Sequence, residues 1–241
     1  MIPVKASSWQ EDRPGFFEVD TVAHCGTSMH GSFAYTLHMV DVATGWTEQW
    51  ALWERGQRGV VTGMKQIEAD LPFPLQGIDS DNGSEFMNWH FLRLFTNRPN
   101  PVQFTRGRPQ HANDSAHIEQ KNWCIVRQFL GYDRFDNPAV IEPLLALYRG
   151  PLRLMINVFH PSARQIEKMR IGEKIRRWHD PPKTPLKRIL DSPYLGDEEK
   201  HRIREQYADL DPFDLMRQIR VLISKIQACA RCSDPNCSAH Q

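Results

Sequence analysis

The sequence contains no apolar run long enough to cross a membrane, and its N-terminus lacks an apolar core. A membrane-spanning helix needs about 20 largely apolar residues, and a secretory signal needs an apolar stretch of about 7–15 near the start. The opening residues, MIPVKASSWQEDRPG, provide neither pattern. The sequence therefore predicts a cytoplasmic protein without a membrane partner.

Cysteine is scarce, and its placement is uneven. The chain has five cysteines, an odd number, and three of them crowd at the C-terminus, which does not resemble a disulfide framework. The spacing C-x₂-C-x₄-C-x₂-H suits tetrahedral Zn²⁺, which binds thiolates and imidazole. Two interpretations stay open, a zinc site and reduced thiols without a function. The candidate ligands are Cys229, Cys232, Cys237 and His240.

No internal repeat interrupts the 241 residues, which suffice for one large domain or one domain with an appendage. The formal net charge of +1 conceals an uneven distribution. Residues 164–188 hold nine Lys or Arg against three Asp or Glu, whereas residues 191–214 hold eight acidic against three basic residues. The basic stretch is either a phosphate-binding surface or a solvated face that pairs with the acidic stretch.

The first part of the chain has the composition of β-strands. A β-branched and aromatic run begins at Phe16, and two further strands flank a turn at residues 43–45, which makes a hairpin. A helix is predicted next, because apolar residues recur at helical spacing. They are Val60, Met64, Ile67 and Leu71.

Strands and helices alternate after this point. Residues 75–80 and 102–106 are predicted as short strands, with a helix over residues 85–95 between them. A further helix over residues 116–131 ends at a glycine, and residues 137–159 continue the helical part. This order predicts an α/β protein of the ribonuclease H-like arrangement: a mixed five-stranded sheet flanked by helices, with a helical C-terminal extension.

Three carboxylates fall where this topology brings elements together. Asp20 lies in the first strand, Asp81 directly follows the fourth, and Glu119 lies on the helix after the fifth. Each has an ordinary alternative, as a solvent-facing strand residue, a turn residue or an exposed helical glutamate. Carboxylates so close together raise each other's pKa unless cations lie among them. Hard oxygen ligands favour Mg²⁺ or Mn²⁺, and two such ions about 4 Å apart can assist phosphodiester chemistry.

Two rival carboxylates are less well placed. Asp79 lies inside the fourth predicted strand, two residues before Asp81, and Asp41 opens the hairpin turn, where a structural role suffices.

Three segments carry a resemblance to a known family: FFEVDTVAHCG, SDNGSEF and NDSAHIEQKN. In combination they resemble the catalytic core of DDE-type transposases and retroviral-like integrases, and above all bacterial insertion-sequence transposases. The resemblance covers residues 14–160, and the tail to about residue 215 is similar to that group's C-terminal extension. It implies a catalytic triad of Asp20, Asp81 and Glu119 and a nucleoid-associated bacterial location.

The activity that the resemblance implies is transfer of DNA phosphodiesters. Water first attacks at an element's end, and the freed 3′ hydroxyl then attacks target DNA. Asp20 and Asp81 would share one Mg²⁺ or Mn²⁺ ion, and Glu119 with Asp20 the other. The implied partners are element-end and target DNA, and either further copies of the chain or a full-length transposase. Candidate DNA-binding residues are Asn82, Arg106, Arg108, Asn113, Lys121, Asn122, Arg176 and Arg177.

The resemblance and the composition together divide the chain into four parts. They are an N-terminal linker (1–13), an integrase core (14–160), a helical basic and acidic extension (161–225) and a possible zinc-binding tail (226–241). The family's upstream helix-turn-helix domain has no counterpart before Phe16. Two alternatives to a recombinase therefore stay open. One is a non-catalytic DNA-binding remnant that interferes with full-length transposase, and the other is a ribonuclease H-like nuclease without strand transfer.

Overall fold

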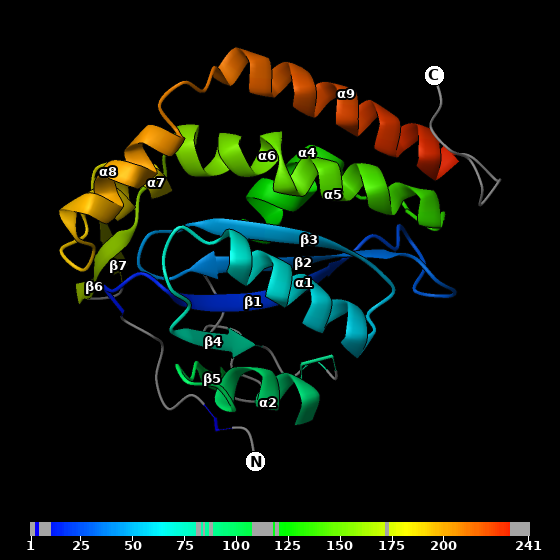
Figure 1. Ribbon diagram of the computed structural model, residues 1–241. Coiled ribbons are helices and arrows are strands. Elements are labelled where there is room, and N and C mark those ends of the chain that lie inside the picture. Colours follow the sequence, from blue (N-terminus) through cyan, green and yellow to red (C-terminus); the bar gives the residue numbers. More distant parts are fainter. Residues whose placement is uncertain are drawn as a thin grey trace.

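The computed structural model describes residues 3–4, 11–80, 83, 85–86, 89–107, 118, 121–171 and 174–231. A five-stranded sheet forms its centre, with helices packed against it (Figure 1). The strands are β1 (Phe16–Ala23), β2 (Ala34–Asp41), β3 (Thr47–Trp53), β4 (Gly77–Ser80) and β5 (Gln103–Arg106).

The strand order is β3-β2-β1-β4-β5. The first three strands form an antiparallel meander, and β4 and β5 extend it as parallel strands on the other side of β1. Parallel neighbours need a crossover, which helix α2 (Trp89–Thr96) provides between β4 and β5. This mixed sheet is the ribonuclease H-like arrangement that the sequence predicts, and it places β1 at the centre.

One face of the sheet is covered by α1 (Gln57–Asp70) and α2. The inward residues of α1 include Val60, Met64 and Ile67, three of the four residues whose spacing predicted this helix. The Phe91 ring of α2 meets the Phe104 ring of β5 edge to face, with the two centroids 5.2 Å apart. Such pairs add to the stability that apolar burial gives this core.

The other face is covered by a helical layer. It consists of the π-helix η2 (Asn122–Arg127), α4 (Gln128–Leu130), the 3₁₀ turn η3 (Pro138–Val140), α5 (Ile141–Arg149), α6 (Pro151–Leu154) and the π-helix η4 (Met155–Phe159). The long helix α9 (Pro212–Arg231) packs outside α5 and α6, so these two helices form a middle layer (Figure 1). The helical C-terminal region that the sequence predicts is therefore present.

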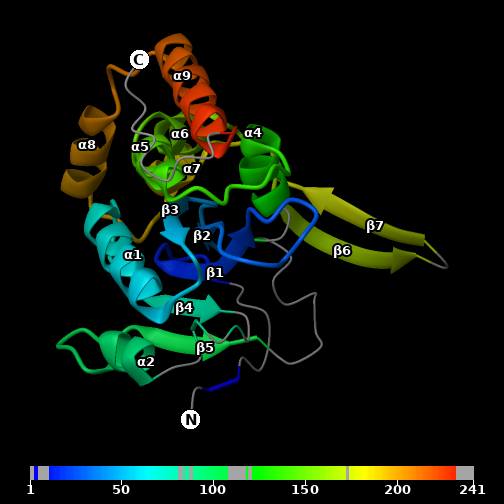
Figure 2. The same ribbon diagram turned by 90° about the vertical axis from the view of Figure 1, so that its right-hand side faces the viewer.

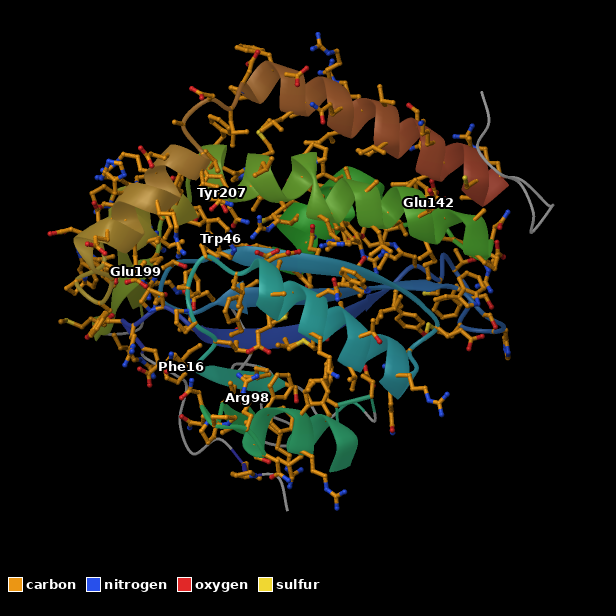
Figure 3. The ribbon with its side chains drawn as sticks, viewed as in Figure 1. Phe16, Trp46, Arg98, Glu142, Glu199 and Tyr207 are labelled. Atoms are coloured by element: carbon orange, nitrogen blue, oxygen red, sulfur yellow. The ribbon has the colours of Figure 1, made fainter. Side chains whose placement is uncertain are left out.

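Polar side chains tie the helical layer to strand β3. The Arg153 guanidinium of α6 lies 2.7 Å from a Glu48 carboxylate oxygen of β3, and Trp46 donates to the same carboxylate. Asn157 makes two hydrogen bonds of 2.8 Å with the backbone of Thr47. The Tyr207 ring, beyond α8 (Asp197–Gln206), lies 6.0 Å from the Trp46 ring (Figure 3). Glu48 and Asn157, both buried, thus find hydrogen-bond partners across the layers.

Asp41 has the structural role that its position at the hairpin turn predicts. Its carboxylate accepts hydrogen bonds from the backbone N–H groups of Gly15 and Thr44 and from the Thr44 hydroxyl. Gly15 adopts a φ of +115°, and a Cβ there would lie 2.5 Å from the Pro74 carbonyl oxygen. Only glycine allows the backbone to come this close to Pro74. The start of β1 is therefore fixed between Pro74 and the Asp41 carboxylate.

Two element predictions are corrected by the structure. Helix α2 begins at Trp89, because Glu85 and Phe86 form a turn before it rather than its first residues. The basic stretch expected to be helical instead begins with a β-hairpin of β6 (Gln165–Ile171) and β7 (Lys174–His179). Helix resumes with α7 (Pro185–Asp191). The apolar residues of this hairpin recur two to four residues apart, so their spacing does not distinguish strands from a helix.

Candidate active site

Asp20 lies on the central strand β1, half-buried beneath helix η2. One of its carboxylate oxygens accepts a hydrogen bond from the backbone N–H of Thr21 at 2.7 Å. The other accepts a hydrogen bond from the Asn122 side-chain amide, also at 2.7 Å. Donors on two elements therefore hold the orientation of this carboxylate. Asn122, predicted as a DNA contact, thus also touches a predicted metal ligand.

The amide of Asn122 also contacts His38. The His38 Nδ1 atom lies 2.5 Å from Asn122 Oδ1, and His38 is the cross-strand partner of Asp20 in the β1–β2 register. Burial lowers the pKa of His38 from its ordinary value of 6.5 to about 4, with the hydrogen bond to Asn122 opposing the shift. The imidazole is therefore neutral at pH 7. Sequence reasoning missed this residue, since nothing in a strand reveals which cross-strand neighbour will face a carboxylate.

A second carboxylate, which no sequence motif marked, lies on the same face of β1 as Asp20. Glu18 is buried, and its Oε2 atom accepts a hydrogen bond from the Ile118 backbone N–H at 3.2 Å. It precedes Asp20 by two residues, the spacing that places strand residues on one face. That spacing was the available signal. Through this bond Glu18 fastens Ile118 to the sheet.

The rival carboxylate Asp79 is placed by the register opposite Glu18 rather than opposite Asp20. It is buried in β4, and its Oδ1 atom accepts a hydrogen bond of 2.6 Å from the Thr105 hydroxyl. This contact joins β4 to β5. Asp79 therefore has a structural role in the sheet interior.

The turn after β4 is fastened to β1 on the opposite face from Asn122. The Thr21 hydroxyl donates to Glu85 Oε1 at 2.9 Å, and the Arg55 guanidinium lies 3.5 Å from the same oxygen. Glu85 belongs to the SDNGSEF segment that carries the family resemblance. The apolar pattern of residues 85–95 predicted Glu85 as part of a helix and gave no sign of this contact.

Five of the residues predicted for catalysis or DNA binding lie outside the described part of the chain: Asp81, Glu119, Asn82, Arg108 and Asn113. The structure therefore leaves their placement as a prediction. Among the described residues, no three His, Cys, Asp or Glu side chains gather in a way that could hold a metal ion. No described helix is long and apolar enough to span a membrane.

The remaining DNA-binding candidates occupy two regions. Arg106 ends strand β5, and Lys121 precedes Asn122 on the helix. Burial lowers the pKa of Lys121, and nearby Arg188 acts in the same direction, while Cys124 opposes them. Arg176 and Arg177 lie exposed on the β6–β7 hairpin, which projects away from the sheet (Figure 2).

The basic stretch is neutralised in part. Asp191 pairs with Lys183 at 2.9 Å and with Lys187 at 2.7 Å, and Asp180 pairs with Arg188 at 2.5 Å. By contrast, Arg176 and Arg177 make no ion pair with another described residue. The exposed positive charge of this stretch is therefore concentrated on the hairpin.

Cys229, the first of the predicted zinc ligands, lies on α9 and is only 2% exposed. It packs in the apolar cluster of the helical layer, and its carbonyl oxygen accepts a hydrogen bond from Asn137. Cys232, Cys237 and His240 lie outside the described residues. Zinc binding by this tail remains a prediction.

No family model matches the sequence. Among curated proteins, the chain is 40% identical over 188 residues to "Uncharacterized protein y4rM" of Sinorhizobium fredii. The match takes in 78% of this chain and 53% of that protein, so the chain spans about half the length of the curated relative.

The fold is similar to that of several solved viral proteins at low sequence identity. A chain of the simian T-cell lymphotropic virus intasome, in complex with a PP2A regulatory subunit, is 16% identical, with a TM-score of 0.48 over 66% of this chain and 54% of that chain. The BIV integrase catalytic core domain is 15% identical, with a TM-score of 0.43 over 60% and 84%. The HTLV-2 integrase catalytic core domain, in complex with magnesium, is 14% identical, with a TM-score of 0.44 over 62% and 90%.

Proposed function

We propose that the protein is a DDE-type transposase or integrase that transfers DNA phosphodiesters, with Asp20, Asp81 and Glu119 as its catalytic carboxylates. The proposal combines the motif resemblance with the ribonuclease H-like sheet. A fold alone does not determine function, and the residues around Asp20 provide the specific support.

The first support comes from the chain on either side of Asp81. Ser80, which directly precedes it, pairs across the sheet with the residue before Asp20. Glu85 accepts a hydrogen bond from Thr21, the residue after Asp20. Consecutive Cα atoms are about 3.8 Å apart, which limits how far Asp81 can lie from Ser80. The described neighbours of Asp81 thus contact β1 on both sides of Asp20.

The chain around Glu119 supplies matching support. Ile118, directly before it, donates its backbone N–H to Glu18. Asn122, three residues after it, donates its amide to Asp20. Both flanks of Glu119 therefore contact the face of β1 that carries Asp20. The residues on either side of Asp81 and of Glu119 thus contact β1 close to Asp20. This is the observation that carries the proposal.

The proposed donor set fits a hard divalent cation. It consists of three carboxylates without thiolate or imidazole, the oxygen ligands that Mg²⁺ and Mn²⁺ prefer. Bound in a pair, such ions supply activation of an attacking oxygen and stabilisation of a leaving one. The protein's own part is to hold the carboxylates, and the bonds from Thr21 and Asn122 already orient Asp20.

DNA would be held by cations around this site and along the hairpin. Arg106 and Lys121 belong to the segments next to the site, whereas Arg176 and Arg177 are exposed on the hairpin. Phosphate contacts by such residues position a duplex without reading its sequence. We propose element-end and target DNA as substrates and further copies of the chain, or a full-length transposase, as partners.

Nicking of supercoiled plasmid and joining of a 3′-hydroxyl duplex test the proposal. Mg²⁺ or Mn²⁺ should support both, and Asp20→Asn, Asp81→Asn or Glu119→Gln should each lower them roughly 100-fold or more, because each removes a ligand charge. Asp79→Asn is the matched control, since it makes the same change two residues from Asp81 within the sheet interior. It should retain most of the activity.

Three other results would contradict the proposed function. Activity that persists in excess chelator, or in Asp81→Asn, would disprove the mechanism. Nicking without joining would indicate a ribonuclease H-like nuclease. DNA binding without nicking, by protein whose triad is intact, would indicate a non-catalytic DNA-binding protein.

A further inference from the structure

Three side chains form a continuous hydrogen-bonded chain from the sheet interior to Asp20. His38 of β2 is fully buried, and its Nδ1 atom lies 2.5 Å from Asn122 Oδ1. Asn122 Nδ2 in turn lies 2.7 Å from Asp20 Oδ2. His38 and Asp20 are also direct cross-strand partners, so the histidine and the carboxylate approach Asn122 from neighbouring strands.

Elementary donor and acceptor rules fix the direction of every bond in this chain. An ionised carboxylate only accepts, so Asn122 must turn its NH₂ group toward Asp20. The amide oxygen then faces His38, and an oxygen facing a ring nitrogen requires an N–H there. The proton of the neutral imidazole therefore lies on Nδ1, which leaves a lone pair on Nε2.

The surroundings of the second ring nitrogen agree with this assignment. His38 Nε2 is buried and has no hydrogen-bond partner among the described residues. A buried N–H without an acceptor is rarer in native proteins than an under-satisfied acceptor. The Nδ1–H tautomer places the lone pair, rather than an N–H, at this position.

We infer that His38 is a positioning residue for the proposed reaction: as the Nδ1–H tautomer it holds the Asn122 amide, which holds the Asp20 carboxylate. The importance of His38 for activity rests on the proposed function, whereas the geometry of the hydrogen bonds does not. Without the His38 donor, the Asn122 amide can turn its oxygen toward Asp20, and two acceptors then repel. The carboxylate loses the bond that orients it toward its proposed metal ion. Residues that orient a metal ligand typically contribute 10–100-fold to metal affinity or activity.

The first test is independent of activity. Long-range ¹H–¹⁵N correlation NMR of the metal-free, ¹⁵N-labelled protein at pH 7.5 reports the tautomer of each histidine. We expect His38 to show the Nδ1–H pattern and to lose it in Asn122→Ala. An Nε2–H pattern for His38 would overturn the inference. If instead Asp20→Asn leaves activity intact, the proposed function fails while the tautomer result stands, so the two failures are distinguishable.

The second test separates positioning from packing. His38→Leu should lower metal-dependent nicking about tenfold, and His38→Asn, which can return an N–H near the Nδ1 position, should recover most of it. His24→Leu is the matched control, because His24 is also fully buried but bonds to Thr36 rather than to the site. It should lower the melting temperature without a comparable loss of activity.

A double-mutant cycle completes the test. If His38 acts through Asn122, His38→Leu should cause no further loss in the Asn122→Ala protein. Losses that multiply would show that His38 influences activity by another route, and so would equal activity losses in His24→Leu and His38→Leu. Either result would overturn the inference.

Discussion

The Thr21 hydroxyl and the Glu85 carboxylate, 2.9 Å apart, join the segment after β4 to the strand that carries Asp20. Glu85 is almost fully buried, so the loss of its donor should cost about 1–3 kcal/mol of stability. We expect Thr21→Val to lower nicking by about tenfold, since small displacements of catalytic groups have large effects. Thr21→Ser keeps the hydroxyl and serves as the control. Plasmid nicking and thermal unfolding of both variants provide the measurement. Equal activity in the two variants would contradict this role.

DNA binding should depend on the hairpin more than on the rest of the basic stretch. Arg176 and Arg177 are exposed, whereas Lys183 and Lys187 pair with Asp191. Each phosphate contact contributes about 0.9 to the slope of log affinity against log salt. The double variant Arg176→Ala, Arg177→Ala should therefore lower affinity and reduce that slope by up to about 2.

The charge-matched control for the hairpin is Lys183→Ala, Lys187→Ala. Fluorescence titration of a labelled duplex at two salt concentrations compares the two double variants. A larger effect of the lysine pair would show that the hairpin is not the main contact. Strong preference for one duplex sequence at high salt would contradict binding through phosphates.

Stability should fall as the pH drops below about 6.5, because His24 is buried neutral. Burial, assisted by Arg127, lowers its pKa from 6.5 to about 3. Between these two pH values the unfolded chain binds a proton at this imidazole, whereas the folded protein does not. The stability is present above pH 6.5 and is lost toward pH 3. At pH 5 this loss is about 2 kcal/mol, and His38 acts in the same direction.

Asp41 opposes this trend. Burial raises its pKa from 3.8 to about 6, against the effect of its hydrogen bonds. Protonation of Asp41 therefore favours the folded state and adds about 1 kcal/mol to the stability between pH 7 and 5. Denaturant unfolding at pH 7.5, 6 and 5 checks the net loss. His24→Leu should flatten the profile. An unchanged slope in this variant would show that other groups cause the acid sensitivity.

The C-terminal tail should bind about one Zn²⁺ per chain if Cys229, Cys232, Cys237 and His240 act together. Cys237→Ser should then remove most of the zinc from the purified protein, as measured by elemental analysis. Cys25→Ser is the control, because Cys25 lies far from the tail in sequence. Equal zinc content in both variants would disprove the site. Zinc that is lost from Cys237→Ser but kept in Cys229→Ser would show that the buried Cys229 is not a ligand.

The sheet could be predicted because its signals are local. Three β-rich runs with a turn at residues 43–45 predict a meander, and apolar spacing in residues 60–67 predicts the helix against it. Gly131 ends its helix as expected, with a φ of +72°, a conformation that glycine adopts without cost. Each of these signals lies within a few residues of the feature it predicts.

The contacts around Asp20 could not be predicted because they join distant parts of the chain. Asn122 was a candidate from the resemblance, but its contacts with Asp20 and His38 span 102 and 84 residues. The hairpin at residues 165–179 was missed because its apolar residues recur two to four residues apart and show no clear period of two. Charge indicates exposure but does not distinguish a helix from a strand.

The π-helical winding of η2 limits how this part of the protein can vary. A π turn holds one residue more than an α turn, so a single deletion within it can be absorbed by a return to α-helical winding that leaves the residues on either side facing as before. A single insertion has no such compensation, because each added residue of an α-helix turns the side chains beyond it by about 100°. An insertion between Asn122 and Arg127 would therefore prevent Asn122 from facing Asp20 while Ile125 and Val126 remain in the core. Deletions should be tolerated here better than insertions.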